Sequence, residues 1–330
     1  MQFSPDKKPP AQALPRPARS HHADRVALGM AAAAASFFMI NTMSVFAKLL
    51  SHDHSVIEVA FYRNLIAAIP FAVWFSLPEH RGHLKIYGRG STIVLRSLIG
   101  TVSLIATFRA FNYLPLADAQ ALFFTSSLFA PVMSFFFLKE YVGPYRWGAV
   151  IAGFLGILVI ARPSGAVNLT GVSLALTAAF LHASLGTLLR ALGRTERPET
   201  VTFYFLAIGA GLTGLAMPFV ATAPSWREVP YILGAGISGA FAQIFLSTAY
   251  KYAPVSLVTI FNYTGIVWAA AYGWFIWGDW PDRAVWAGAG IIVASSLFIM
   301  WRENRMAKLV RLLDAAPARA QRHENENRQT

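Results

Sequence analysis

Among the charged side chains that lie within long apolar stretches of the sequence, four are candidates for binding a solute. Glu58 and Arg63 share one stretch. Lys48 ends the stretch before it, and Arg109 lies near the end of the stretch after it. A charge at the centre of a bilayer costs at least about 2.5–3.5 kcal/mol on insertion scales. Three cations beside one carboxylate leave an excess of positive charge, which favours solutes that carry a carboxylate or a phosphate.

A structural interpretation competes with anion binding at these positions. Lys48 and Arg63 can extend toward the water interface, or Arg63 and Glu58 can form a structural pair, and we expect a structural role for Lys48 and Arg109. Arg63 lies about seven residues into its stretch, roughly 10 Å deep at 1.5 Å per residue. Arg63 is therefore the expected binding residue, because a guanidinium can hold a carboxylate through two parallel hydrogen bonds.

Uncharged polar side chains in the same stretches extend the candidate binding set. Asn41 and Lys48 fall on one helical face with Ser44, because their spacings are three and four residues. His182 can relay protons, although a histidine satisfied within the core explains it as well. The other candidates are Tyr62, Asn112, Gln120, Gln243, Asn262 and Tyr263. Each of them can instead hydrogen-bond a neighbouring helix.

Two carboxylates, Glu140 and Asp279, end apolar stretches at corresponding places in the two halves of the chain. An anion is favourable at a helix N-terminus, so each can cap the helix that follows. Alternatively, the two carboxylates form gating contacts that change between states. We expect a structural role, because the repetition suits an element of the fold.

Ten apolar stretches position these side chains. The chain has 55% apolar and 13% charged residues, whereas soluble domains carry about 25% charged residues. A helix needs about 20 apolar residues to cross the hydrocarbon core. The stretches run over 27–50, 56–77, 94–112, 117–138, 145–161, 170–189, 200–221, 230–250, 255–277 and 283–301. The sequence therefore predicts an all-α integral membrane protein with ten transmembrane helices.

The distribution of positive charge predicts the orientation. Segments 1–26 and 302–330 are polar and basic, and we expect them to be cytoplasmic tails, the first one disordered. The loops on the same side as these tails carry eight Lys and Arg residues, and the opposite loops carry three at most. Both tails share one side only if the number of spans is even. We expect a bacterial inner-membrane protein with both termini in the cytoplasm.

The two halves of the chain repeat each other. Residues 110–115 (AFNYLP) match residues 249–254 (AYKYAP) at an offset of 139. Earlier in each half the offset is 142, which pairs Phe61 with Phe203. Each half holds five predicted spans, so the second half enters the membrane from the opposite side. The sequence thus predicts two inverted five-helix repeats with a site at their interface near the midplane.

The stretch 108–120 (FRAFNYLPLADAQ), Trp147 and the glycine-rich run 153–156 form a recognisable set. They resemble the EamA-type branch of the drug/metabolite transporter superfamily. The resemblance implies two EamA-like repeats, over 27–161 and 170–301, around a central substrate cavity. It implies no particular substrate. The second half has Phe205 where the first half has Arg63, which is a departure from full symmetry.

These observations favour a secondary carrier that moves small organic metabolites by alternating access. The expected solutes are amino-acid-like or otherwise anionic or zwitterionic. A non-transporting membrane sensor or partner protein is the alternative, and an intramembrane enzyme is a third interpretation. The sequence contains no HExxH, G-x-S-x-G or P-loop motif to support catalysis.

The expected partners are a small-molecule substrate and the lipid bilayer, with a homodimer as a further possibility. We expect no nucleic acid, because the basic residues form no stripe interleaved with exposed aromatics. The chain has no cysteine, which excludes thiolate and iron–sulfur chemistry. We expect no cofactor and no metal.

Overall fold

The computed structural model describes residues 19–129, 132–133, 143–161, 168–192, 195–253, 255–302 and 305, and they form helices joined by short loops. The helices are α1 (Arg19–Leu50), α2 (Val56–Ser76), α3 (Gly90–Phe111), α4 (Leu116–Phe123), α6 (Pro144–Ala161), α7 (Leu169–Leu192), α8 (Pro198–Val220), α9 (Val229–Tyr252), α10 (Val255–Asn262) and α11 (Gly265–Tyr272). A short 3-10 helix η1 (Arg81–Leu84) and a π-helical turn η2 (Gly273–Trp277) accompany them. The last helix spans Arg283–Arg302.

Six helices of the described part are long and apolar enough to cross a membrane. They are Val26–Leu50 within α1, all of α2, α3 and α8, Val229–Ala249 within α9, and the last helix. Two shorter apolar helices, Trp147–Ala161 and Leu169–Leu185, lie within α6 and α7. The chain is therefore a multi-pass membrane protein.

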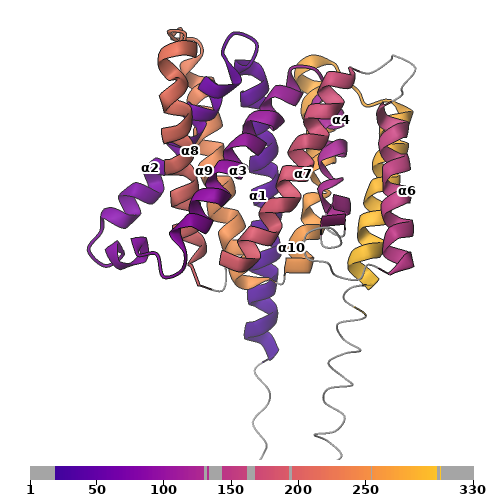
Figure 1. The fold of residues 1–330 in the computed structure, drawn as a ribbon, viewed down its shortest axis with the longest axis horizontal. Helices are drawn as coiled ribbons and strands as arrows, with labels where there is room; N and C mark the ends of the chain where they lie inside the picture. The colour runs from indigo at the N-terminus through magenta and orange to yellow at the C-terminus, as the bar shows by residue number, and fades with distance from the viewer. Residues whose placement is uncertain are drawn as a thin grey trace, which may run out of the picture.

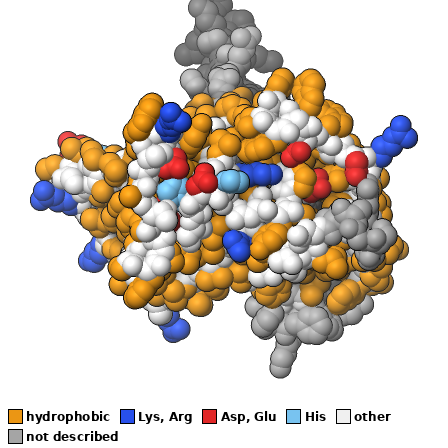
Figure 2. All heavy atoms as spheres, turned by 90° about the horizontal axis from the view of Figure 1, so that it is seen from above, with side chains coloured by type: hydrophobic (Ala, Val, Ile, Leu, Met, Phe, Trp, Pro, Cys, Tyr) orange, Lys and Arg blue, Asp and Glu red, His pale blue; other side chains and the backbone are white. Residues whose placement is uncertain are grey.

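The polarity of α2 is inverted relative to a helix of a soluble protein. Leu65, Ile69 and Val73 are 44%, 53% and 61% exposed, and their spacing of four residues puts them on one face. Arg63 and Asn64 are buried among the other helices. Apolar side chains that face outward match the hydrocarbon of a bilayer. Figure 2 shows hydrophobic side chains around the periphery of the molecule as well.

The helices pack in a layered bundle with α1 near its middle (Figure 1). Helix α1 packs against α9, α2 against α8, and α3 against α7. Further contacts join α2 to α9, α3 to α8, α1 to α10, α4 to α7 and α4 to α11. We call the end where α1 finishes the upper end and the opposite end the lower end, as they stand in Figure 1.

Helix α6 and the last helix lie side by side at one edge of the bundle (Figure 1). A Cβ atom added to Gly156 would come within 2.9 Å of the Gly288 carbonyl oxygen. The same addition at Gly288 would come within 2.6 Å of the Gly156 carbonyl oxygen. Two facing glycines thus allow these backbones to approach closely, as small residues do between membrane helices.

Two helices begin at least four residues before their predicted starts. Helix α1 begins at Arg19, inside the segment 1–26 that was expected to be a disordered tail. Helix α3 begins at Gly90, four residues before the predicted start at 94. In both cases polar residues extend an apolar helix beyond the stretch that hydropathy detects, because backbone hydrogen bonding continues where hydrophobicity ends.

Candidate functional site

Two predicted spans, 117–138 and 255–277, are interrupted rather than continuous. Helix α4 ends at Phe123, and α10 ends at Asn262, each after eight residues. The Thr125 hydroxyl donates to the Leu122 carbonyl at 2.6 Å, and the Thr264 hydroxyl donates to the Phe261 carbonyl at the same distance. A hydroxyl that bonds its own backbone competes with the helical ladder, which accounts for both interruptions.

Polar side chains converge where these interruptions lie. A Cβ at Gly265 would sit 2.7 Å from Nε2 of Gln120 and 3.3 Å from Nδ2 of Asn41. Gly265 opens α11, so α1, α4 and α11 meet at this point. Asn41 is buried and donates to the Phe37 carbonyl at 2.8 Å, and Gln120 is half-buried. The structure therefore brings together two predicted binding residues from different helices.

Tyr263 lies at the second interruption and contacts the first. Its ring meets the ring of Phe124 edge-on, with centroids 5.2 Å apart. Its hydroxyl interacts with the hydroxyls of Ser127 and Ser296. Those two hydroxyls are 2.5 Å apart and join the first half of the chain to the last helix. Of the predicted residues, Asn262 is half-buried beside this contact at the end of α10.

Arg63 extends from α2 between α1 and α9. Its side chain is 3% exposed. Nε donates to Sδ of Met43 at 3.2 Å, and a terminal nitrogen donates to Oδ1 of Asn64 at 2.7 Å. No carboxylate of the described residues forms a salt bridge with it. The expected pair with Glu58 is wrong, because Glu58 bonds other groups.

Arg96 is a second buried cation, and the sequence analysis did not select it. It is 8% exposed, and its guanidinium carbon lies 3.9 Å from the ring centroid of Phe205. The guanidinium carbon of Arg63 lies 5.9 Å from the same centroid. A cation over an aromatic ring gains about 2 kcal/mol when desolvated, less than the several kcal/mol that burial of an ion costs. The early start of α3 at Gly90 puts Arg96 deeper than predicted.

Hydrogen-bond donors around these two arginines lack acceptors. Nε and one terminal nitrogen of Arg96 are buried without a partner, as is Nδ2 of Asn64. Arg63 and Arg96 act on each other electrostatically, and Arg96 also acts on His182 of α7. His182 is exposed. The expectation of a histidine satisfied within the core is therefore wrong.

Glu58 takes part in a contact between the two halves at the upper end. It is fully buried, and its carboxylate lies 3.1 Å from Nδ1 of His54. It also accepts bonds from the backbone N–H and the hydroxyl of Thr222, at 3.3 and 3.2 Å. Nε2 of His54 lies 3.2 Å from the carboxylate of Glu228. We call these four residues the upper contact.

The upper contact favours a protonated histidine. Burial by itself would lower the pKa of His54, but the adjacent carboxylates of Glu228 and Glu58 outweigh burial and raise the pKa above the ordinary value. The pKa of Glu228 is lowered, first by the Ser225 backbone N–H and then by His54. In Figure 2 acidic and histidine side chains form a band across this end.

A second contact joins the halves at the lower end. Glu196 is 6% exposed and accepts hydrogen bonds from the backbone N–H groups of Tyr87, at 3.0 Å, and Gly88. The Thr200 hydroxyl donates to the His83 carbonyl at 2.6 Å. We call these residues the lower contact. No sequence argument had singled out Glu196.

The remaining charged candidates lie at the upper rim. Lys48 donates to the Leu114 carbonyl at 3.2 Å and lies over the Trp277 ring at 4.9 Å. It is in electrostatic reach of Asp279. Arg109 is exposed and bonds the Tyr113 hydroxyl at 3.2 Å. Because these side chains have partners or face water, they give no internal excess of charge.

Asp279 does not cap the following helix, which was one expectation for it. Asp282 does so, because its carboxylate accepts from the backbone N–H groups of Ala284 and Val285 at 2.9 and 3.1 Å. Asp282 stands immediately before the first residue of the helix, which is the position that capping requires. Glu140, the other predicted carboxylate, lies outside the described residues.

Three other predicted residues lie apart from the convergence at Gly265. Asn112 is exposed, and its amide lies 3.4 Å from the Ser51 carbonyl at the upper rim. Tyr62 packs edge-on against Phe61, and Gln243 is half-buried on α9.

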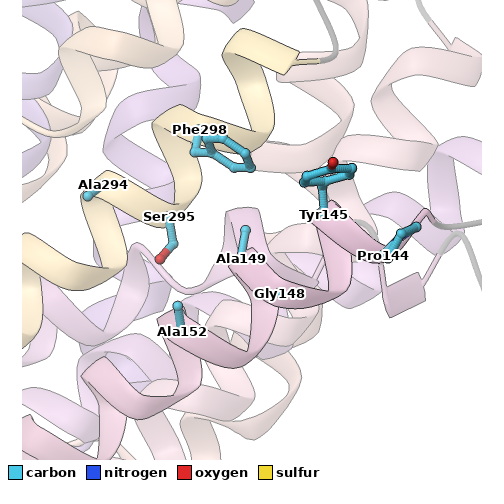
Figure 3. A pocket seen from close by; sticks show the side chains of 8 residues that line it. All are labelled: Pro144, Tyr145, Gly148, Ala149, Ala152, Ala294, Ser295 and Phe298. Carbon is cyan, nitrogen blue, oxygen red and sulfur yellow. The ribbon is translucent and has the colours of Figure 1, made fainter.

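An open groove lies between α6 and the last helix (Figure 3). It is lined by Pro144, Tyr145, Gly148, Ala149, Ala152, Ala294, Ser295 and Phe298. None of the predicted binding residues lines it, and its side chains are mostly small and apolar. An apolar groove with few polar groups lacks the means to recognise a polar metabolite.

Known proteins resemble the chain over most of its length. A riboflavin transporter of Rhizobium johnstonii is 31% identical over 84% of this chain and 92% of its own length. A pseudopaline exporter of Pseudomonas aeruginosa is 26% identical over 83% of this chain and 96% of its own. An S-adenosylmethionine uptake transporter of Rickettsia prowazekii is 26% identical over 79% and 88%. These relatives are named as membrane transporters of small metabolites.

A solved crystal structure shares the fold, with a TM-score of 0.56 at 16% identity, over 82% of this chain and 98% of that one. The model of the EamA-like transporter family matches residues 27–162 and again residues 169–301. The two matches cover nearly the same ranges as the two halves that the sequence predicted. The chain belongs to the EamA-like transporter family, and like its relatives it is a membrane transporter of small metabolites.

Proposed function

We propose that the chain is a secondary carrier that moves its solute by alternating access between two inverted five-helix repeats. The observation that carries the proposal is the register of the two helix interruptions. Thr125 and Thr264 are 139 residues apart, and so are the first residues of α4 and α10. This is the offset at which the sequences of the two halves align. Discontinuous helices at corresponding places of two repeats are typical of carriers with a site at the repeat interface.

The helix contacts support a two-fold exchange between the halves. In the alignment of the two halves, α1, α2, α3 and α4 correspond in order to α7, α8, α9 and α10. Exchange of the halves then turns the α1–α9 contact into the α7–α3 contact. The contact of α2 with α9 becomes that of α8 with α3, and α1 with α10 becomes α7 with α4. Each of these partner contacts is present. An exchange of this kind gives two pseudo-symmetric states, one open to each side.

Ten crossings and cytoplasmic termini complete the proposal. The interrupted segments α4 and α10–α11–η2 count as one crossing each, and α6 and α7 as further crossings. The lower end then faces the cytoplasm of a bacterium, because the loops there carry more Lys and Arg residues than those at the upper end. The upper end faces the periplasm.

The proposed solute is amino-acid-like or otherwise anionic or zwitterionic. Arg63 supports this class, because it is buried and has no carboxylate partner among the described residues. Asn41 and Gln120 at the interruptions supply neutral hydrogen-bonding groups. The names of the relatives suggest S-adenosylmethionine and riboflavin as first probes.

Counterflow in proteoliposomes tests the carrier mechanism. Purified protein is reconstituted, and uptake of labelled S-adenosylmethionine, riboflavin and L-glutamate is measured with and without the same unlabelled solute inside. We expect saturable uptake of at least one solute and acceleration by the internal solute, because a carrier reorients faster when loaded. Flux that rises linearly without counterflow would indicate a channel. Absence of flux for a broad metabolite panel would favour the sensor or partner alternative.

A further inference from the structure

Arg63 and Arg96 form a buried cationic pair at the interface of the two halves. Arg63 belongs to α2 and Arg96 to α3, and the ring of Phe205 on α8 lies near both guanidiniums, at 5.9 and 3.9 Å. They are 3% and 8% exposed. Arg63 also acts electrostatically on Arg96, and the interaction is repulsive. Two like charges buried together are unfavourable unless an anion completes the site.

The pair contains donors that lack acceptors. Nε and a terminal nitrogen of Arg96 have no partner, and Nδ2 of the fully buried Asn64 has none either. Phe205 offers a ring face, which attracts a cation but cannot accept these N–H groups in good geometry. Buried polar groups of native proteins are nearly all hydrogen-bonded, so an unsatisfied cluster of donors indicates a missing acceptor.

We propose that Arg63, Arg96 and Asn64 form the subsite that binds the carboxylate of the transported solute. The inference rests on the proposed carrier function and names the residues that recognise the solute's charge. A carboxylate offers two oxygens with lone pairs for about four hydrogen bonds, which suits the two guanidiniums and the amide. A solute bound there contacts helices of both halves, as a site at a repeat interface requires.

The position of Phe205 makes the subsite asymmetric between the two repeats. Arg63 and Phe205 are 142 residues apart and therefore occupy equivalent places in the two repeats. One repeat thus contributes a cation where the other contributes an aromatic ring. The carboxylate binds on the side of the first repeat, and the uncharged part of the solute faces the second repeat. A symmetric pair of arginines would provide no such preference.

Thermal unfolding of the purified protein in detergent tests the subsite. The probes are L-methionine and succinate, compared with L-methioninamide and succinamide, which lack the carboxylates. Inorganic phosphate is a further probe, and ionic strength is held constant with chloride. We expect both carboxylates to raise the melting temperature and the two amides to leave it unchanged, because a ligand that binds the folded state stabilises it.

Variants of the two helices sharpen this test. In Arg96→Met and Arg63→Met, we expect apparent carboxylate affinity to fall by at least ~10-fold, about the factor for losing one charge-assisted hydrogen bond. Arg109→Met is the matched control, because Arg109 lies on α3 as Arg96 does but is exposed. Arg96→Lys retains the charge but not the fork, and its affinity is expected to fall as well. Arg96→Lys replaces the methionine variants in the binding test if these do not fold.

A second readout separates binding from a structural role. Without a carboxylate, Arg96→Met is expected to melt at a higher temperature than the wild type, because an unpaired buried charge has been removed. A structural arginine would give the opposite result. The proposal is overturned if no carboxylate stabilises the wild type, if Arg96→Met responds as the wild type does, or if phosphate alone stabilises. Carboxylate binding without counterflow would support the subsite and refute the carrier mechanism. Counterflow that Arg96→Met does not change would support the carrier mechanism and refute the subsite.

Discussion

The upper and lower contacts join the same two halves of the chain with different chemistry. At the upper end, the carboxylates of Glu58 and Glu228 hold the imidazole of His54. At the lower end, backbone N–H groups bond the carboxylate of Glu196. The residues correspond in sequence, because His54 and Glu196 are 142 residues apart, as are Glu58 and Thr200.

This difference makes the two ends unequal in their response to pH. The raised pKa of His54 means that the upper contact binds a proton more tightly when formed than when broken. Its contribution is complete below the ordinary histidine pKa of about 6.5 and is lost as pH rises through the raised value. The hydrogen bonds that define the lower contact join a carboxylate to backbone N–H groups and a hydroxyl to a backbone carbonyl, with no imidazole among them. A repeated scaffold thus places an imidazole at the centre of one contact and not of the other.

Glu58→Ala should have the largest effect on this comparison. The change removes one of the two carboxylates beside the buried imidazole of His54, and the Thr222 N–H loses its acceptor. Loss of one partner of a buried ion pair costs about 3–5 kcal/mol, and we expect the free energy of unfolding in detergent at pH 6 to fall by about that much. Glu79→Ala is the control, because Glu79 is exposed and its removal should change stability by less than about 0.5 kcal/mol. Equal effects of both substitutions would contradict the buried contact.

Glu196→Ala should weaken the lower contact by a smaller amount. Two backbone N–H groups, those of Tyr87 and Gly88, lose a charged acceptor. Each unsatisfied buried donor costs about 1–3 kcal/mol, and partial access of water to this loop keeps the total near the lower figure. Hydrogen exchange of the Tyr87 and Gly88 amides can follow the opening, because these are the N–H groups that Glu196 bonds. Their exchange should accelerate in the Glu196→Ala background, and an unchanged rate would show that Glu196 does not hold this loop.

His54→Gln should abolish the pH dependence of the upper contact with only moderate loss of stability. The Thr222 amide, which bonds Glu58, should exchange with solvent faster at pH 8 than at pH 6 when His54 is present. Rates are normalised to those of the same amide in the unfolded chain, which removes the intrinsic effect of pH on exchange. In His54→Gln the normalised rates should be equal at the two pH values, as they should be for the Tyr87 amide of the lower contact. A pH-dependent rate that persists without His54 would assign the response to another group.

The sequence predicted the repeat and most helix boundaries to within a few residues, because both depend on apolar stretches and local turns. It did not predict the interruptions at Thr125 and Thr264, because a threonine hydroxyl that bonds its own backbone leaves hydropathy unchanged. The 139-residue offset that relates these two threonines was available in the sequence, and a search for paired hydroxyl residues would have found them.

The partners of the charged residues were predicted less well. Glu58 was expected to pair with a cation, although His54 stands four residues before it at the spacing that brings side chains together on a helix. The histidine was overlooked because it precedes the apolar stretch. Arg96 was not selected, because the predicted helix began at 94 instead of Gly90 and so left this residue close to its end. Tertiary contacts such as those of Phe205 with the two arginines leave no local pattern in the sequence.

Glu228→Gln should have the smallest effect on stability and still change the pH response. Glu228 is the more exposed carboxylate of the upper contact, so water replaces much of its interaction with His54. Its contact with His54 is, however, the largest of the contributions that raise the pKa of His54. The pH at which the Thr222 amide becomes accessible to exchange should therefore fall toward the ordinary histidine value, without a loss of the response itself. Asp53→Asn is the matched control, because Asp53 bonds the exposed His52 two residues from His54 and lies outside the contact. A midpoint that moves in Asp53→Asn as far as in Glu228→Gln would mean that general surface charge, rather than the bond across the two halves, sets the protonation of His54.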